Sequence, residues 1–146
     1  MSNKHKSADL LLKLYEARRE PVLREARNWM MTFFPESSDD IMKAMMDPQQ
    51  SAYFRMVTTY WDMACSFANH GAIDEEMFKD VSGERVAVFA KIEPFLAEMR
   101  GAMNSPKYLH NLEKNVMKID NAKEVLAGRR ETMKRMMQAR SAENKG

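Results

Sequence analysis

The strongest candidate for a binding site in this sequence is a narrow line of polar side chains within a long apolar segment. These side chains, called the polar stripe below, are Arg55, Thr59, Asp62 and Ser66. Spacings of four, three and four residues place them on one face of a helix. Inside a bundle they could form a ligand pocket. We favour a buried network that fixes helix register, in which Asp62 pairs with a basic residue such as Arg85 or Arg100.

Metal binding and nucleophilic catalysis have weaker support. His110 and Glu113 share a helix face, but di-iron bundles need a Glu-x-x-His pair on each of two helices, and this single pair has the reverse order. Cys65, the only cysteine, lies in an apolar segment without a basic neighbour that would favour its thiolate. We therefore predict no catalytic residue, no metal site and no cofactor, and we expect a protein that is not an enzyme.

Methionine is abundant, with 15 residues, and the pattern M-x-x-M-M occurs at residues 42–46 and again at 133–137. Thioether sulfur is a soft ligand that suits Cu(I), and residues three and four apart lie on one helix face. Methionine also fills irregular cores and forms adaptable contact surfaces. We favour the contact surface and keep copper binding as the alternative.

The two ends of the chain are basic and the middle is acidic. Residues 106–146 contain ten Lys or Arg against five Asp or Glu. The clustered cations near the C-terminus are Arg129, Arg130, Lys134, Arg135 and Arg140. They could bind nucleic-acid phosphates or an anionic membrane surface. However, Glu124 and Glu131 alternate with them and no aromatic residue follows Tyr108, so a solvated helix face is the preferred interpretation.

The elements that carry these groups are predicted to be helices. Glycine and proline number five each, and apolar residues return every three or four positions. The length of 146 residues fits one domain, 1–146. We expect an all-α, irregular bundle of five or six helices with a central buried helix over about 48–70. The terminal segments 1–7 and 141–146 are expected to be disordered.

Prolines set the expected helix boundaries. A first helix begins near Ser7 or Ala8, and Pro21 either kinks it or opens a second helix. Pro94 is expected to kink the helix that follows Ser82-Gly83. Ser105-Pro106 opens the last element, which we expect to be one long helix or two nearly collinear helices.

A short joint after the central helix has strong local signals. Gly71 suits the left-handed position just past a helix end. Asp74 can cap the next helix, and Ile73 and Phe78 have the spacing of a hydrophobic staple. These residues predict a helical hairpin but no chemistry.

Three segments carry a resemblance to a known family. They are Tyr60–Ala64, Asn69–Phe78 and Ala90–Phe95 continuing to Glu98-Met99-Arg100. Over about residues 50–112 the chain resembles a family of bacterial helical proteins that is known only as a domain of unknown function. In some members a hydrophobic anchor precedes the domain, whereas the first helix here is amphipathic and charged. The resemblance implies a helical fold and supplies no catalytic residue.

These observations favour a non-enzymatic interaction or regulatory module, with self-association among its expected modes. The alternative is a sensor that binds a small ligand at the polar stripe. Nucleic-acid or anionic-surface binding through the basic C-terminal helix comes third. The sequence has no run of about 20 apolar residues that would span a membrane. The start over residues 1–6 is polar, and the apolar run over 10–12 that follows it is interrupted at Lys13, so we expect no signal peptide and a cytoplasmic protein. We expect its partner to be a protein, either a second copy of this chain or a different protein.

Overall fold

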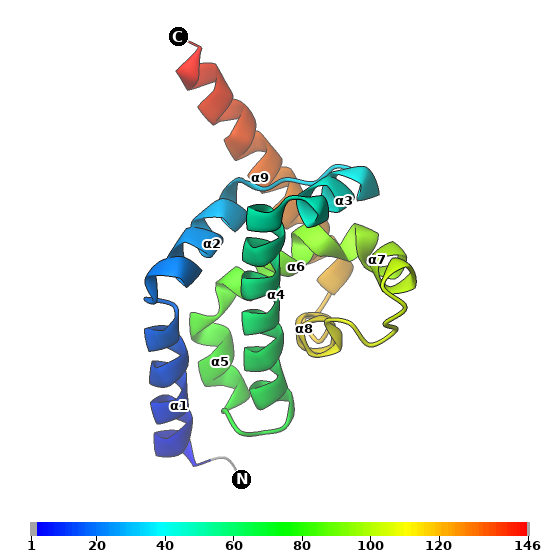
Figure 1. Ribbon diagram of the computed structural model, residues 1–146. Helices are drawn as coiled ribbons and strands as arrows, with labels where there is room; N and C mark the ends of the chain where they lie inside the picture. The colour runs from blue at the N-terminus through cyan, green and yellow to red at the C-terminus, as the bar shows by residue number, and fades with distance from the viewer. Residues whose placement is uncertain (1–2, 146) are drawn as a thin grey trace.

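The computed structural model describes residues 3–145, and every regular element in this range is a helix (Figure 1). The elements are α1 (Lys4–Ala17), α2 (Pro21–Thr32), α3 (Ser38–Met46), α4 (Pro48–Asn69), α5 (Glu75–Val81), α6 (Gly83–Ile92), the 3-10 helix η1 (Glu93–Phe95), α7 (Leu96–Ala102), α8 (His110–Val116) and α9 (Ala122–Asn144). The predicted all-α class is confirmed. The predicted number of five or six helices is too low for residues 3–145, because short turns divide several of the expected segments.

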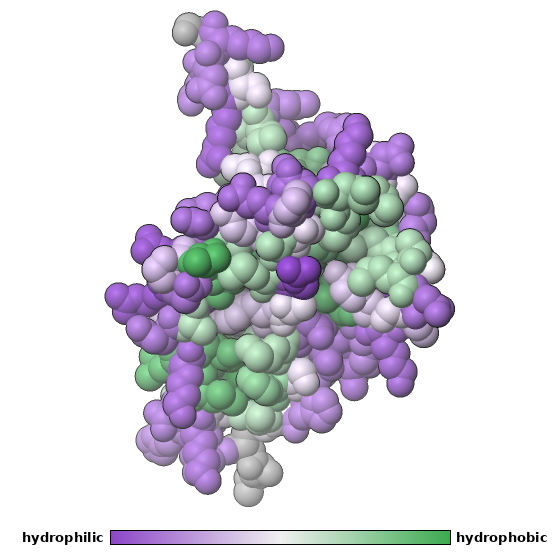
Figure 2. All heavy atoms as spheres, viewed as in Figure 1, coloured by the Kyte–Doolittle hydropathy of each residue, from purple (hydrophilic) through white to green (hydrophobic). Residues whose placement is uncertain are grey.

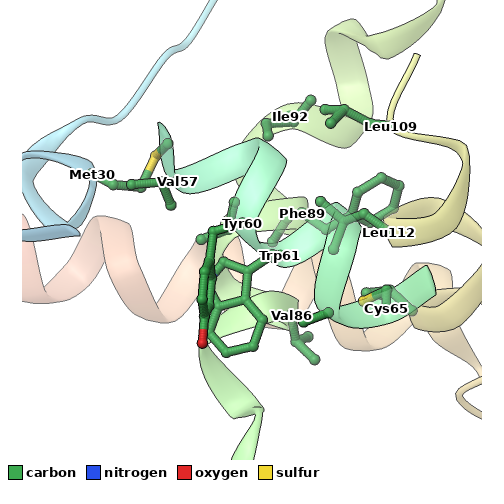
Figure 3. Close-up of a cluster of buried hydrophobic side chains, with 14 of the residues drawn as sticks. Met30, Val57, Tyr60, Trp61, Cys65, Val86, Phe89, Ile92, Leu109 and Leu112 are labelled. Atoms are coloured by element: carbon green, nitrogen blue, oxygen red, sulfur yellow. The ribbon is translucent and has the colours of Figure 1, made fainter. Parts of the chain in front are cut away.

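Helix α4 is the central element, as predicted. Asp47 caps its start, where Oδ1 accepts hydrogen bonds from the backbone N–H groups of Gln49 at 2.9 Å and Gln50 at 2.8 Å. Helices α2, α3, α5 and α8 pack around it. Figure 3 shows its side chains Val57, Tyr60, Trp61 and Cys65 among residues from α2, α6 and α8. An apolar surface that covers most of a helix has to be enclosed in this way.

The N-terminal segment is more ordered than its polar composition suggests. Helix α1 begins at Lys4, and Asn3 Oδ1 accepts from the N–H groups of His5 and Lys6. Ser7 is buried, and its hydroxyl oxygen accepts a hydrogen bond from the Asp74 N–H at 3.0 Å. The prediction of disorder over 1–7 is therefore wrong for residues 4–7, because a cap and a tertiary contact hold them. Residues 1 and 2 lie outside the described range.

Two prolines have different effects. Pro21 opens the separate helix α2, and the Glu20 carboxylate accepts from the next two free N–H groups, those of Val22 and Leu23. Pro94 lies in η1, which joins α6 to α7 and so replaces the predicted kink by a change of helix type. In both cases the missing proline N–H falls where no helical partner is needed.

The C-terminal part differs most from expectation. Ser105-Pro106 does not open a helix; α8 begins at His110 and α9 at Ala122. The residues just before them, Leu109 and Asn121, have left-handed backbone with φ of 56° each. In Figure 1 α8 is seen nearly end on whereas α9 runs up the picture, so the two are not collinear. Burial of the Leu109 side chain offsets the strain of this conformation.

The C-terminal tail is helical rather than disordered. Helix α9 continues through Asn144, and its second half extends beyond the rest of the molecule (Figure 1). The prediction of disorder over 141–146 is therefore wrong for residues 141–144, and residue 146 lies outside the described range.

The joint between α4 and α5 has the predicted form. Gly71 has φ of 81°, Asp74 Oδ2 accepts from the Met77 N–H at 3.1 Å, and Ile73 and Phe78 are both buried. A Cβ on Gly71 would meet no atom within 4 Å, so only the backbone opposes a larger residue. We expect Gly71→Ala to lower the free energy of unfolding by about 1 kcal/mol.

Urea denaturation measures this change. The matched control is Gly128→Ala within α9, where a Cβ is equally unobstructed and φ is not positive. We expect the control to leave stability unchanged or to raise it slightly, because alanine is the better helix former. Equal stability of Gly71→Ala and the wild type would contradict the role assigned to the joint.

Candidate functional site

The polar stripe of α4 does not converge on a cavity. Arg55 and Thr59 are exposed, and Thr59 Oγ1 donates to the Arg55 carbonyl oxygen at 2.5 Å. Ser66 is half-buried, with Oγ 3.4 Å from His70 Nδ1. These contacts are local to α4. The stripe is the edge of the helix that faces outward between its neighbours.

Asp62 has a different partner from the one expected. Its Oδ1 accepts a hydrogen bond from the backbone N–H of Leu112 at 2.9 Å, in the first turn of α8. The N-cap residue Leu109 offers no side-chain acceptor. Asp62 therefore caps α8 from another helix and places a negative charge at its N-terminus.

We expect Asp62→Ala to lower the free energy of unfolding by about 1 kcal/mol, the usual cost of a lost cap. Asp62→Asn keeps an acceptor oxygen and should retain most of the stability. Denaturant unfolding monitored by circular dichroism compares the two variants. A loss in Asp62→Asn as large as that in Asp62→Ala would assign the effect to charge rather than to the hydrogen bond.

A buried polar network does exist, but it uses other residues. Arg85 Nε donates to Asn115 Oδ1 and Arg85 Nη1 to the Ser82 carbonyl oxygen, both at 2.8 Å. Asn115 Nδ2 donates to Asn69 Oδ1 at 3.0 Å, and Asn69 in turn donates to the Asn111 carbonyl oxygen at 3.1 Å. Burial lowers the pKa of Arg85. The network ties α4, α6 and α8 together.

The remaining residues singled out from the sequence are dispersed. Arg100 binds the Tyr108 carbonyl oxygen at 2.9 Å and Glu113 Oε1 at 3.1 Å. Cys65 is fully buried, which raises the pKa of its thiol to about 12, so it has little thiolate at neutral pH. Within residues 3–145 no three His, Cys, Asp or Glu side chains gather as a metal site would require.

A hollow lies where α9 leaves the rest of the molecule, and we call it the α9 groove. Its volume is about 890 Å³, within the range of small-molecule sites. Its apolar walls come from the connection between α2 and α3, from η1 and from α9. They are Phe34, Pro35, Pro94, Phe95, Met133, Met137 and Ala142. The lining along α9 runs from Arg130 to Lys145, about 22 Å of helix, so the groove is elongated.

Lys91 of α6 is the unusual residue of this site. Its side chain lines the α9 groove and also a second hollow of about 220 Å³ beside the same part of α9. It is only 5% exposed, donates to the Met30 carbonyl oxygen and lies 4.5 Å from the centre of the Phe34 ring. Burial lowers its pKa to about 8. No carboxylate in the described part of the chain forms an ion pair with it.

Further cations surround the α9 groove. Arg130 Nη1 donates to the Ala90 carbonyl oxygen at 2.9 Å and lies 3.6 Å from Glu93 Oε2. Lys134 and Lys145 are exposed on the α9 wall, and Glu36 is the acidic lining residue. Basic side chains therefore outnumber acidic ones around an apolar centre. Such a site can bind an amphipathic molecule.

The sequence indicates only one wall of this groove. The methionines and basic residues near the C-terminus are separate features of the sequence, and the fold brings them together with Phe34 and Lys91. Neither of these two residues is a predicted site residue. A lysine in the otherwise apolar row Val86–Ile92 was the available signal, because such a lysine becomes buried when the helix does.

Together, fold and site define an all-helical protein with an elongated, apolar and basic groove. The chain belongs to the family described as a domain of unknown function, DUF4760, whose sequence model matches residues 5–119. The match is wider than the expected 50–112 and ends before α9. No curated protein and no solved structure was found to match the chain. None of the helices described combines the length and apolar character that crossing a bilayer requires.

Proposed function

We propose that this protein is a non-enzymatic module that binds a small, elongated, largely apolar ligand in the α9 groove. The groove itself is the observation that carries the proposal: a hollow of about 890 Å³ with two aromatic rings, two prolines and two methionines in its walls. Pockets for small molecules have this size and composition. Small-ligand binding is the alternative function expected from the sequence, with the polar stripe as its site. The site proposed here is the α9 groove instead.

A neutral fluorescent probe tests this proposal. N-phenyl-1-naphthylamine becomes bright in apolar surroundings, and we expect saturable binding to the wild-type protein. Met137→Glu places a charge in the α9 wall and should weaken binding at least tenfold, because an unpaired carboxylate is costly in an apolar site. Met103→Glu, at an exposed methionine outside the groove, is the control. Equal binding by both variants would exclude the groove as the site.

Interaction with a protein partner is the second candidate, and it was the first choice from the sequence. Leu12 and Tyr15 on one face of α1 are 68% and 57% exposed. Figure 2 shows apolar residues among hydrophilic ones over the lower part of the face in view, around the positions of α1, α5 and α4 in Figure 1. Exposed apolar patches favour protein contacts. Light scattering should detect an oligomer that the double variant Leu12→Asp/Tyr15→Asp dissociates, and a monomeric wild type would contradict self-association.

Two further expectations remain proposals. The projecting part of α9 is mostly hydrophilic (Figure 2). The exposed cations of the whole helix, Arg129, Lys134, Arg135 and Arg140, could contact phosphates. Filter binding to nucleic acid should then weaken steeply with salt. We also place the protein in a bacterial cytoplasm, where the buried thiol of Cys65 would stay reduced.

A further inference from the structure

We propose that the ligand of the α9 groove is an amphipathic anion, a long-chain carboxylate whose head group pairs with Lys91 while its chain lies against Phe34, Phe95 and Met133. This inference rests on the proposed small-ligand function and adds the chemical class of the ligand. It depends on one buried charge and on the surfaces next to that charge.

The charge of Lys91 is only partly compensated. An ammonium group has three N–H donors, and the structure gives a hydrogen-bond acceptor to one of them, the Met30 carbonyl oxygen. The Phe34 ring face, 4.5 Å away, supplies a cation–π contact. The groups in contact with this cation, which is 5% exposed, are therefore neutral. Glu84, earlier on α6 and also a lining residue of the second hollow, forms its ion pair with Arg27. Burial lowers the pKa of Lys91, and the charge of Glu84 opposes this only in part. A charge removed from water in this way is stabilised most by an opposite charge.

The position of Lys91 shows from which side an anionic ligand can reach its ammonium group. Lys91 is a lining residue of both hollows beside α9. Arg130 is already bound to Glu93 and to the Ala90 carbonyl oxygen. Lys134 and Lys145 are exposed, so solvent screens their charges. Lys91 is therefore the cation through which the groove can discriminate a charged head group from a neutral one.

The apolar walls specify the rest of the ligand. Phe34 contacts the Lys91 ammonium and also lines the groove, so a head group at Lys91 is next to an aromatic surface. Phe95 and Met133 continue the lining on η1 and α9. Methionine adapts to flexible apolar partners. A single carboxylate matches a single buried ammonium, and an alkyl chain matches the elongated apolar walls.

Isothermal titration of the protein, residues 1–146, with sodium decanoate and with 1-decanol at pH 7 tests the inference. The wild type should bind decanoate at least tenfold more tightly than decanol. Lys91→Met keeps an unbranched chain and removes the charge, so it should lose this preference and retain decanol binding. Lys43→Met, an exposed lysine on α3 outside the groove, should behave as the wild type.

The outcomes separate the two proposals. Equal affinity of the wild type for decanoate and decanol would overturn the anionic head group and leave the small-ligand function standing. Binding of neither probe would overturn both. Retention of the decanoate preference in Lys91→Met would overturn the role of Lys91. Circular dichroism of each variant verifies that it is folded before titration.

Discussion

Trp61→Ala is expected to lower the free energy of unfolding by about 4 kcal/mol, close to the upper end for a buried aromatic residue. Trp61 is 1% exposed and lies at the centre of α4, where its ring meets Tyr60 edge-on with centroids 5.0 Å apart. Truncation to alanine would leave a cavity lined by α4 and its neighbours. Because domains of this size have an unfolding free energy of about 5–15 kcal/mol in total, the variant should lose a large part of its stability.

Polar contacts add to this loss. Trp61 Nε1 donates to Glu84 Oε2 at 3.1 Å, and Arg27 Nε lies 3.1 Å from the same oxygen. The Arg18 guanidinium lies 4.7 Å from the Trp61 ring centre. Trp61 therefore connects the C-terminal end of α1 and the middle of α2 with the start of α6. Replacement by alanine removes both the packing and the hydrogen bond to a half-buried carboxylate.

Trp61→Phe separates these two contributions. Phenylalanine keeps most of the apolar volume and lacks the N–H donor, so its expected cost is about 1–2 kcal/mol. Urea denaturation followed by far-UV circular dichroism measures both variants. If Trp61→Ala cost less than 1 kcal/mol, or no more than Trp61→Phe, Trp61 would not occupy the core position described.

Local signals in the sequence were sufficient for the centre of the fold. The apolar surface of α4 predicted a buried helix, and Asp47, Gly71 and Asp74 marked boundaries that depend on their own hydrogen bonds or backbone freedom. The same reasoning failed near Leu109, whose left-handed backbone is maintained by burial of its side chain in a distant core. No neighbouring residue encodes that contact, so the start of α8 could not be placed.

The candidate site was less accessible to prediction, for a related reason. Its lining combines Phe34, Lys91 and Met133, which are far apart in the sequence and meet only after α9 packs on α6. The polar stripe was misleading because a polar line on a largely apolar helix marks the part that leaves the core. Arg55 and Thr59 face solvent for that reason. The buried cation of the α9 groove, Lys91, instead lies on the short helix α6, next to apolar residues.

Lys91→Met is expected to stabilise the protein at neutral pH, with a gain that shrinks as the pH rises. Burial lowers the pKa of Lys91 from 10.5 to about 8, so between these values the folded state binds fewer protons than the unfolded state. Folding stability of the wild type therefore increases with pH in this window. The full shift corresponds to about 3 kcal/mol of destabilisation below pH 8, which the methionine variant would not carry.

The measurement compares urea unfolding of the wild type and Lys91→Met at pH 7 and at pH 9. The difference in unfolding free energy between the two proteins should decrease by about 1.4 kcal/mol over this interval. At pH 9, one pH unit above the folded-state pKa of Lys91, about that much of the destabilisation by the charged side chain is lost. Cys65, Tyr60 and the half-buried Tyr108 have the opposite effect at higher pH, because loss of contact with water raises the pKa of Cys65 to about 12 and also raises the pKa values of both tyrosines. These groups are present in both proteins, so their contributions to the pH dependence of stability cancel in the comparison. A constant difference would mean that burial does not destabilise the charged form of Lys91, and the reason for an anionic ligand in the α9 groove would disappear with it.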